Sequence, residues 1–405
     1  MPNKKRIRFV SITLSIFTAM GLLLALNHPL SGQDLKSLGF DKVLAIEIRN
    51  TGQVELENYP VTINVEAIRA VAPDFNSYNF GLFEMVGGEF RLIQTQTDDL
   101  DQDRHHEEIF FLKTLPVGST IKLMVYYSSK GSMQLMIARK VFARPDAKNP
   151  NENVSWESLF NAWKFDRGRI IPYGKFTKAL VLQQMRSEDG RPQGWGMRLV
   201  APDATGGTGG LKVWNGTKGI SLYSSDAMEV VYEKPVILSI GPLRTIVRID
   251  YKPVKTGSGQ TAVSCLYSQP ADTSYTRVDV SLRRETEDEI ILGPAIRKTR
   301  GETTQLDDKQ GFFSAWGPGS PGAGDYGAAV VFRASDFMGL AELDTEWALK
   351  FKAGSGKKLT YWLISAWSRG ANSPRSPAVN NWPKVAAGLA ADLTVPVEIS
   401  IKPEK

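Results

Sequence analysis

The chain has 405 residues, with 49 Lys and Arg against 43 Asp and Glu, three His and one Cys. Four of the basic residues and none of the acidic ones lie in the first 33 positions, so the remainder carries a net charge of only +2. This balance gives no support to nucleic acid as a partner, and the single Cys265 excludes an intramolecular disulfide. A chain of this length has room for two domains.

The N-terminus has the pattern of an export signal. The basic stretch 4-KKRIR-8 precedes an uncharged, mostly apolar run at 9–26, and the breaker-rich 27-NHPLSGQ-33 follows. This order is typical of a secretory signal peptide. It also fits an uncleaved anchor, because a spanning helix needs about 17–25 residues. We expect residues 1–33 to be a cleaved signal, a periplasmic or secreted mature protein, and no stable membrane insertion after cleavage.

Residues 34–143 are expected to form a small N-terminal β-sandwich domain. Apolar and polar residues alternate in 61-VTINVEA-67 and 120-TIKLMVYY-127, which is the period of a half-buried strand. Turn residues separate the expected strands, which are 43–50, 61–68, 90–97, 109–115 and 120–128.

The polar stretch 144–155 has no apolar period and is predicted to be an interdomain linker. Residues 156–405 are expected to form a large, mostly antiparallel β-sandwich, because strand-like runs alternate there with glycine-rich turns. Two segments are expected to be helical, 156-WESLFNAW-163 and 382-WPKVAAGLAADL-393, the second with apolar residues at i, i+3 and i+4.

The segment 162-AWKFDRGRIIPYGK-175 combines many ionisable residues with an aromatic ring. One interpretation is a sugar- or uronate-binding loop, in which Tyr173 or Lys175 transfers a proton and Arg167 binds a carboxylate. Asp166 and Arg169 would then contact the substrate. The other interpretation is a solvated loop with Tyr173 packed and Lys175 exposed, and the residues alone leave both open.

Tryptophans beside glycines suggest a stacking surface for sugar rings. They occur in 194-GWGMRLVAPDATGGTGGLKVWNG-216 and 361-YWLISAWSRG-370, and neither segment has the G-x-x-x-x-G-K-[ST] pattern of a phosphate loop. The alternative is a glycine hairpin with tryptophans in the core. On the first interpretation, these segments supply further substrate-binding residues: Trp195, Arg198, Trp214, Trp367 and Arg369.

Several short motifs together carry a resemblance. They are Y-G-K at 173–175, W-G at 195–196, G-x-G-G-L-x-x-W at 207–214, G-P-x-R at 241–244 and Y-W-x-x-x-x-W at 361–367. With them the chain resembles the domain-of-unknown-function family 4861 over nearly its whole length after the signal. The resemblance implies an exported component of polysaccharide degradation with carbohydrate as its ligand. It also implies that residues 156–405 are similar to the galactose-mutarotase-like supersandwich, but it supplies no proven reaction.

The stretch 97-TDDLDQDRHHEE-108 is a second candidate site. Asp99, Asp101 and Asp103 alternate as in a calcium loop, because Ca²⁺ binds several carboxylate oxygens at close quarters. Gln102 and Arg104 stand where the resemblance implies glycines, so a solvated acidic hairpin is favoured over Ca²⁺. We expect no required cofactor, with Ca²⁺ as the candidate ion.

Histidine chemistry finds little support in the sequence. His28 lies in the expected signal, and adjacent residues of a strand point to opposite faces, so His105 and His106 do not suggest a zinc site. Hydrolysis would need two carboxylates, for which Asp166, Asp203 and Glu285 are available.

Elimination on a uronide needs only a proton-transferring Tyr173 or Lys175 and a cation such as Arg167 or Arg169. We expect a polysaccharide lyase or glycoside hydrolase acting on acidic polysaccharide or oligosaccharide. The alternative is a non-catalytic glycan-binding or assembly protein.

Overall fold

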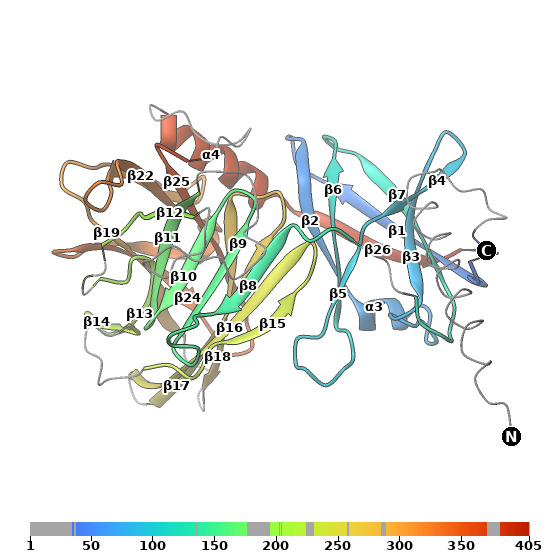
Figure 1. Cartoon of the computed structure of the whole chain (residues 1–405), viewed down its shortest axis with the longest axis horizontal. Coiled ribbons are helices and arrows are strands. Elements are labelled where there is room, and N and C mark those ends of the chain that lie inside the picture. Colours follow the sequence, from blue (N-terminus) through green and yellow to red (C-terminus); the bar gives the residue numbers. More distant parts are fainter. Residues whose placement is uncertain are drawn as a thin grey trace, which may run out of the picture.

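The structure is a computed structural model that describes residues 35, 38–133, 137–175, 195–201, 203, 205–223, 231–256, 259–284, 289–370 and 381–404. Glu285 and the expected signal, residues 1–33, lie outside the described residues. Within them the chain consists almost wholly of antiparallel strands in five sheets, which confirms the all-β fold class (Figure 1). No helix among the described residues is long and apolar enough to span a bilayer.

A small sandwich of two sheets forms the N-terminal unit. Its five-stranded sheet has the order β26 (Val397–Pro403), β1 (Lys42–Asn50), β7 (Thr120–Tyr127), β3 (Phe80–Val86) and β4 (Glu89–Ile93). Its three-stranded sheet has the order β2 (Leu56–Asn64), β6 (Glu108–Leu115) and β5 (Gln96–Asp98). Alternate residues such as Ile48, Phe111 and Leu123 fill the core between the sheets. The short helix α3 (Val65–Arg69) occupies the second half of the strand expected at 61–68.

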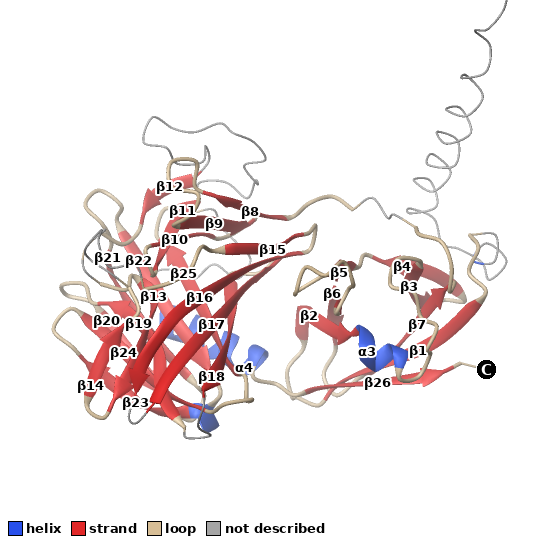
Figure 2. Ribbon diagram, turned by 90° about the horizontal axis from the view of Figure 1, so that it is seen from below, coloured by secondary structure: helices blue, strands red, loops and turns tan. Residues whose placement is uncertain are grey.

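The last strand of the chain belongs to this first sheet. β26 pairs with β1 from Leu44↔Pro403 to Asn50↔Val397, so the C-terminus lies beside the N-terminal unit (Figure 2). The sequence assigned residues 156–405 to one large domain. Strand pairing overrides that boundary at 397–403, because a strand's own pattern does not say which neighbour it will join.

Three sheets form the large unit. An eight-stranded sheet has the order β15 (Val236–Ile240), β16 (Arg244–Thr256), β17 (Gly259–Pro270), β18 (Tyr275–Arg284), β25 (Leu359–Trp367), β22 (Asp325–Phe332), β21 (Phe312–Pro318) and β20 (Thr303–Asp307). One five-stranded sheet, the β8–β12 sheet, has the order β12 (Trp195–Arg198), β11 (Arg169–Lys175), β10 (Ala162–Asp166), β9 (Asn153–Ser158) and β8 (Val141–Pro145). The other five-stranded sheet has the order β14 (Lys218–Ser221), β13 (Thr208–Asn215), β19 (Ile290–Arg297), β24 (Glu346–Ala353) and β23 (Phe337–Glu342).

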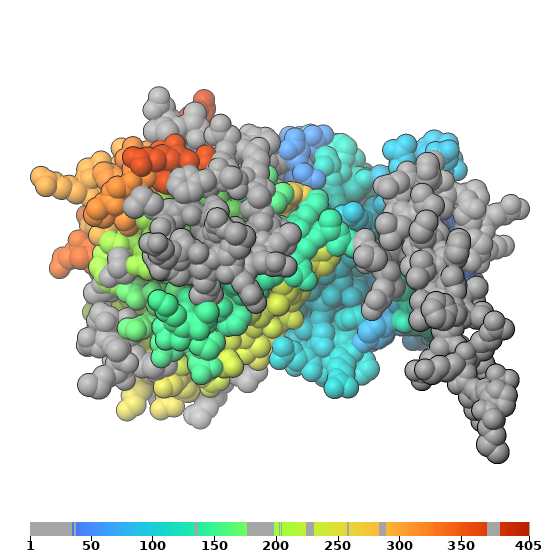
Figure 3. All heavy atoms as spheres, in the orientation of Figure 1, coloured from blue at the N-terminus to red at the C-terminus, as the bar shows by residue number. Residues whose placement is uncertain are grey.

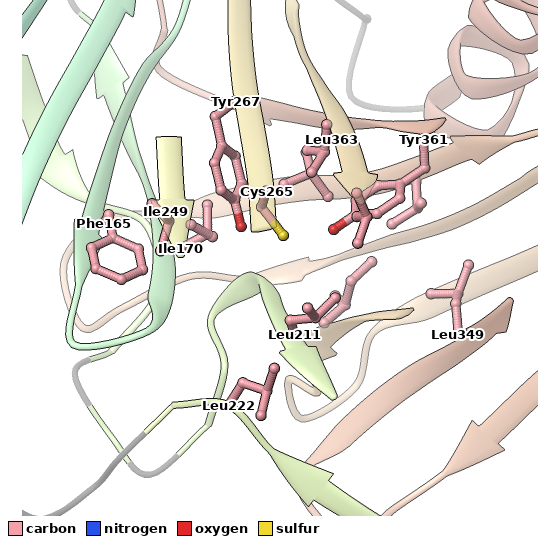
Figure 4. Packing of buried hydrophobic residues seen from close by; sticks show 14 of the residues in the cluster. Phe165, Ile170, Leu211, Leu222, Ile249, Cys265, Tyr267, Leu349, Tyr361 and Leu363 are labelled. Atoms are coloured by element: carbon pink, nitrogen blue, oxygen red, sulfur yellow. The ribbon is translucent and has the colours of Figure 1, made fainter. Parts of the chain in front are cut away.

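Both five-stranded sheets pack on the same face of the eight-stranded sheet. One apolar cluster joins all three, with Phe165 and Leu211 meeting residues such as Val263. In its interior, Cys265 lies between Tyr267 and Tyr361 (Figure 4). The large unit is therefore an antiparallel supersandwich, in line with the expected fold class.

The opposite face of the eight-stranded sheet is covered by α4 (Trp382–Leu393). Trp382 and Leu389 of this helix pack against Trp362 of β25. The helix predicted at 382–393 is confirmed. Trp362 and Trp367 lie in the clusters on opposite faces of the sheet, as their spacing indicated.

Two predictions for residues 144–163 are wrong. The expected helix at 156–163 is the end of β9 and the start of β10, and Trp156 pairs directly with Trp163 across these strands. The expected linker at 144–155 contains the end of β8 and the start of β9. Both indoles are buried between the sheets, so tertiary packing overrides the helical spacing of the apolar residues.

A buried arginine joins the two units. The Arg244 Nε donates to Asp98 Oδ2 at 2.7 Å, and its Nη2 donates to Glu108 Oε2 at 2.5 Å. The guanidinium also lies 4.5 Å from the ring centroid of Phe110. Because these partners are in β5 and β6 while Arg244 begins β16, this contact fixes the large unit against the N-terminal sandwich. Figure 3 shows the two units in direct contact.

The backbone beside Arg244 is held by Gln96. The Gln96 Oε1 accepts hydrogen bonds from the backbone N–H groups of Leu243 and Arg244 at 2.8 and 2.9 Å. A Cβ at Gly241 would lie 2.0 Å from the Gln96 amide carbon, so only glycine permits this approach. The G-P-x-R motif of the sequence is thus an interdomain contact.

Replacing Arg244 by Met should destabilise the protein by about 3–5 kcal/mol, because it leaves the carboxylate of Asp98 buried without its cation. Arg49→Met is the matched control, since the Arg49–Glu398 ion pair is exposed and should contribute only about 0–1 kcal/mol. Urea unfolding monitored by tryptophan fluorescence measures both. Equal unfolding midpoints for the two variants would contradict a stabilising role for the contact of Arg244 with Asp98 and Glu108.

Candidate functional site

The outer face of the β8–β12 sheet carries one continuous row of directly opposed residues. The register pairs Phe142 with Glu157, Glu157 with Ala162, Ala162 with Tyr173, and Tyr173 with Arg198. The row crosses all five strands of the sheet, and directly opposed residues share a face. We call these five residues the site row.

The other face of the same strands belongs to the core. Trp163, Phe165 and Ile170 point inward into the large cluster and are fully buried. Alternation along each strand therefore directs the polar residues outward. The site row is a consequence of this period, although Glu157, Ala162 and Tyr173 are themselves buried.

Lys175 lies two residues after Tyr173 on β11 and therefore on the same face. Its Nζ donates to Glu157 Oε2 at 2.8 Å and to the Ser158 carbonyl oxygen at 2.6 Å. The two charged side chains are 0% and 1% exposed. Burial lowers the pKa of Lys175, and the charge of Glu157 opposes this effect. A buried amine of lowered pKa beside a carboxylate is an arrangement suited to proton transfer.

Tyr173 is held by a cation from the neighbouring strand. The Arg198 Nε donates to the Tyr173 hydroxyl at 3.2 Å, and the guanidinium lies 5.9 Å from the ring centroid. Tyr173 pairs with Arg198 and Lys175 with Trp195, so β12 has one extra residue here and forms a bulge. Such bulges turn side chains locally and are frequent beside active sites.

Trp367 supports this region from the core side. A Cβ at Gly174 would lie 2.1 Å from the Trp367 ring, so the indole packs directly under the β11 backbone. The Trp367 Nε1 donates to the Ala323 carbonyl oxygen at 2.7 Å. Trp367 is therefore a packing residue, and its predicted role as a sugar-stacking surface is wrong.

Asp166, Arg167 and Arg169 lie at the other end of β11, around the turn that joins it to β10. The Arg169 Nη2 donates to Asp166 Oδ2 at 3.2 Å, and the Arg167 Nε lies 3.8 Å from a Glu152 carboxylate oxygen. Four steps of extended strand, about 13 Å, separate Arg169 from Tyr173. Because the segment is extended, these residues do not contact Tyr173, and their role in substrate binding stays a prediction.

Trp214 lies in a different sheet. It is buried on β13 against Ala295 and Ala348, and the Lys350 Nζ lies 5.4 Å from its ring centroid. The predicted convergence of all three segments on one cleft is therefore wrong for Trp214.

The remaining candidates are Arg369 and Trp195, and a Cβ at Gly370, which follows Arg369, would lie 3.7 Å from the Lys175 carbonyl oxygen. Arg369 is exposed just after β25, where its Nη1 donates to the Gly322 carbonyl oxygen at 3.0 Å. Trp195 pairs through its backbone with Lys175, and its side chain lies outside what the structure describes.

Sequence reasoning missed Glu157, which is the buried partner of Lys175. Glu157 lies inside 156–163, which was expected to be helical, and only a period of two places it on the face opposite Trp156. Read with period two, 153-NVSWES-158 places Val154 and Trp156 inward and Glu157 outward, as the structure does. That pattern was the available signal.

The acidic stretch is the loop that joins β5 to β6, between the two residues that bind Arg244. Ligand atoms of four carboxylates lie within 4.8 Å of one another, those of Asp99, Asp101, Asp103 and Glu107. The sequence did not identify Glu107 as a member of this group. Burial raises the pKa of the Glu107 carboxyl, and repulsion by the three aspartates adds to this effect.

The backbone of this loop folds around Asp99. The Asp99 carboxylate accepts from the N–H groups of Gln102 at 2.6 Å and Arg104 at 2.8 Å. Gln102 and Arg104 have φ angles of 67° and 76°. These are left-handed values that favour glycine, so the loop keeps the shape for which the resemblance implies glycines. Ca²⁺ at this loop remains a prediction.

The two histidines do not share a site. The His106 Nδ1 lies 3.1 Å from Ser77 Oγ, and the ring packs 4.4 Å from that of Tyr78. His105 is exposed.

The chain matches the model of a known protein family. The family described as Domain of unknown function (DUF4861) matches residues 48–399. The chain belongs to this family. The match confirms the resemblance that the short motifs carried.

Solved structures show only a distant likeness. A protein in the Glycosyl Hydrolase Family 38 from Enterococcus faecalis is 8% identical, with a TM-score of 0.42 over 97% of this chain and 51% of that one. An alpha-mannosidase from Enterococcus faecalis V583 is also 8% identical, with a TM-score of 0.39 over 91% and 47%. The chain spans about half the length of these structures, and at such TM-scores the likeness carries no argument. No curated protein matches it.

If the loop of Asp99, Asp101, Asp103 and Glu107 binds Ca²⁺, the ion should raise the melting temperature by mass action, with about 2.7 kcal/mol at a hundredfold excess over Kd. Asp101→Asn should reduce this gain, whereas the exposed Asp308→Asn should not. Calorimetry with calcium and with chelator measures the difference. Superimposable melting curves would support the other interpretation, in which the loop is a solvated hairpin without bound Ca²⁺.

The lowered pKa of Lys175 should make stability depend on pH. The folded protein releases this proton at a lower pH than the unfolded chain, so the free energy of unfolding should rise as pH approaches the ordinary lysine value of 10.5. The reference is Lys175→Met/Glu157→Gln, which leaves no buried charge unpaired. Urea unfolding from pH 7 upward gives the difference between the two proteins. A difference that is constant or falls with pH would show that burial does not penalise the Lys175 charge.

Proposed function

We propose that this protein is an exported carbohydrate-active enzyme that cleaves acidic, uronate-containing polysaccharide or oligosaccharide by β-elimination. The observation that carries the proposal is the grouping of Tyr173, Lys175, Glu157 and Arg198 on one face of the β8–β12 sheet. The resemblance carried by the short sequence motifs implies carbohydrate as ligand. The apolar run at 9–26 supports export.

Elimination suits these residues better than hydrolysis. Hydrolysis needs two carboxyl groups flanking the scissile bond, and the site row holds one, Glu157. Elimination needs a base, an acid and a cation that stabilises the charge developing on the uronate carboxylate. Lys175, Tyr173 and Arg198 are of the right types, and their backbones are adjacent in β11 and β12.

In the proposed step, each of three residues acts on one part of the uronate. Lys175, once it has released its proton, takes the proton from C5 of the uronate, and Arg198 pairs with the carboxylate as negative charge develops there. The C4–C5 double bond forms while the C4–O bond breaks. Tyr173 donates its hydroxyl proton to the leaving oxygen. Arg198 replaces Arg167 in the role expected from the sequence, because it is the arginine that contacts Tyr173.

One observation favours a second function. Lys175 and Glu157 are buried and bound to each other, which is also what a structural ion pair inside a non-catalytic glycan-binding protein would show. In that case the site row would position a glycan without turning it over.

Tyr173→Phe should lower turnover by roughly 10²–10⁴-fold with folding intact, because it removes the proton donor and keeps the ring. Tyr126→Phe in the N-terminal sandwich is the matched control and should leave turnover unchanged. The assay follows ultraviolet absorbance of the unsaturated product from polygalacturonate and from alginate, alongside reducing ends.

Three outcomes separate the functions. Unsaturated product that depends on Tyr173 supports the lyase. New reducing ends without unsaturation would indicate a hydrolase. Saturable binding with neither signal would establish the non-catalytic function, and unchanged turnover in Tyr173→Phe would remove this residue from the mechanism.

A further inference from the structure

The turn between β9 and β10 holds Lys175 in place. Ser158, where the turn begins, supplies the carbonyl oxygen that accepts from the Lys175 Nζ at 2.6 Å. The Ser158 N–H donates to the Asn161 carbonyl oxygen at 2.9 Å, and the Asn161 N–H donates to Ser158 Oγ at 3.3 Å, which closes the turn. Both residues are buried. A shift of this turn therefore moves one of the acceptors that position the proposed base.

The turn between β17 and β18, residues 271–274, binds the β9–β10 turn. Ser158 Oγ donates to the Thr273 carbonyl oxygen at 3.2 Å, and the Asn161 Nδ2 donates to the Ser274 carbonyl oxygen. These contacts join the eight-stranded sheet to the β8–β12 sheet. Because a buried polar group that loses its partner costs free energy, the two turns are held together.

The 271–274 turn is also bonded to the residues on which the N-terminal sandwich docks. The Ala271 N–H donates to the Leu243 carbonyl oxygen at 2.6 Å. Leu243 and Arg244 are the residues whose N–H groups bind the Gln96 amide oxygen of β5. Hydrogen bonds through the 271–274 turn therefore connect the interdomain contact with the acceptor of the proposed base.

The conformation of the 271–274 turn depends on contacts outside it. Asp272 has a φ angle of 56°, a left-handed value that costs free energy in a residue other than glycine and persists only where the surroundings hold it. The Lys140 Nζ donates to Asp272 Oδ2 at 2.7 Å, and Lys140 immediately precedes β8 on the segment that comes from the N-terminal sandwich. Without its contacts to this segment and to β16, the turn would relax.

A small crevice leaves space on one side of the turn. Thr273 and Ser274 line it together with Asn58 and Tyr59 of β2 and Leu393 of α4, around a volume of about 30 Å³. This volume has room for about two water molecules and for no sugar. The N-terminal sandwich is therefore not packed tightly against the turn here, and the turn can shift when the hydrogen bond at its start is lost.

We propose that the 271–274 turn makes the position of Lys175 depend on the docking of the N-terminal sandwich, with Asn161 as the positioning residue. This inference rests on the proposed function and names how the same site is regulated. While Gln96 holds the start of β16, the 271–274 turn keeps the β9–β10 turn against the Lys175 Nζ. When the sandwich separates, the turn relaxes and the amine is no longer held.

The kinetic test breaks the connection at its two ends, in Gln96→Met and in Asn161→Ala, and follows turnover of polygalacturonate and of alginate. Each variant should lower kcat about 10- to 100-fold with KM unchanged, because a small displacement of a reacting group costs that much. The double variant should be no slower than the slower single variant, since both changes break one connection. Lys113→Met, which removes an ion pair with Glu84 inside the N-terminal sandwich, is the control and should keep the kcat of the unaltered protein.

A second measurement needs no turnover. Modification of lysines by acetic anhydride, followed by mass spectrometry, gives the rate at Lys175 relative to that at Lys212, a buried lysine of β13 paired with Glu346. Gln96→Met and Asn161→Ala should each raise this ratio about 10-fold, because only Lys175 gains exposure by local opening. The Lys113→Met control should leave the ratio unchanged.

An unchanged labelling ratio in either variant, or losses of kcat that multiply in the double variant, would overturn the coupling. An equal rise of the ratio in Lys113→Met would overturn it as well, as a general loosening of the protein. Failure here is distinguishable from failure of the proposed function. A protein without turnover whose labelling ratio rises loses only the enzyme, whereas an active lyase with an unchanged ratio loses only the coupling.

Discussion

The buried contact of Arg244 with Asp98 and Glu108 is the constraint on which the arrangement of the molecule depends. It connects the first residue of β16 to the facing ends of β5 and β6, and it is reinforced where the Gln96 amide binds the adjoining backbone. A buried guanidinium must keep both carboxylates, because losing either leaves charge unpaired away from water. The same two carboxylates close the acidic loop, so the geometry of that loop and the docking of the two units are set by one group of atoms.

A second feature follows from strand alternation. The β8–β12 sheet covers the core with its inner face, which frees its outer face for polar residues. Glu157 and Lys175 pair within that face while almost wholly excluded from water, and their mutual attraction and the Ser158 carbonyl offset the cost of burying them. Ala162, the smallest side chain of the row, separates this pair from Tyr173 and Arg198. A substrate would have to reach these groups over the same face.

The motifs that carry the family resemblance act mainly through packing. Gly174 of Y-G-K is the point where the Trp367 ring meets the β11 backbone, and Gly241 of G-P-x-R is the point where Gln96 reaches the interdomain strand. Such motifs identify the fold because a side chain there would collide with a neighbour. They identify chemistry less well. Tyr173 belongs to the site row and Lys175 lies beside it, whereas Trp367, which was expected to stack on a sugar ring, is buried in the core.

The sequence by itself determined the β class, most strands of the N-terminal sandwich, the helix at 382–393 and the candidate pair Tyr173 and Lys175, because period-two and period-3.6 patterns are local properties of the chain. It did not determine that 156–163 is two strands, that Glu157 is the partner of Lys175, or that Arg198 rather than Arg167 contacts Tyr173. Those facts depend on which strands pair and in what register. Pairing is decided by burial against the eight-stranded sheet, so only the tertiary structure could bring Phe142, Glu157, Tyr173 and Arg198 into one row.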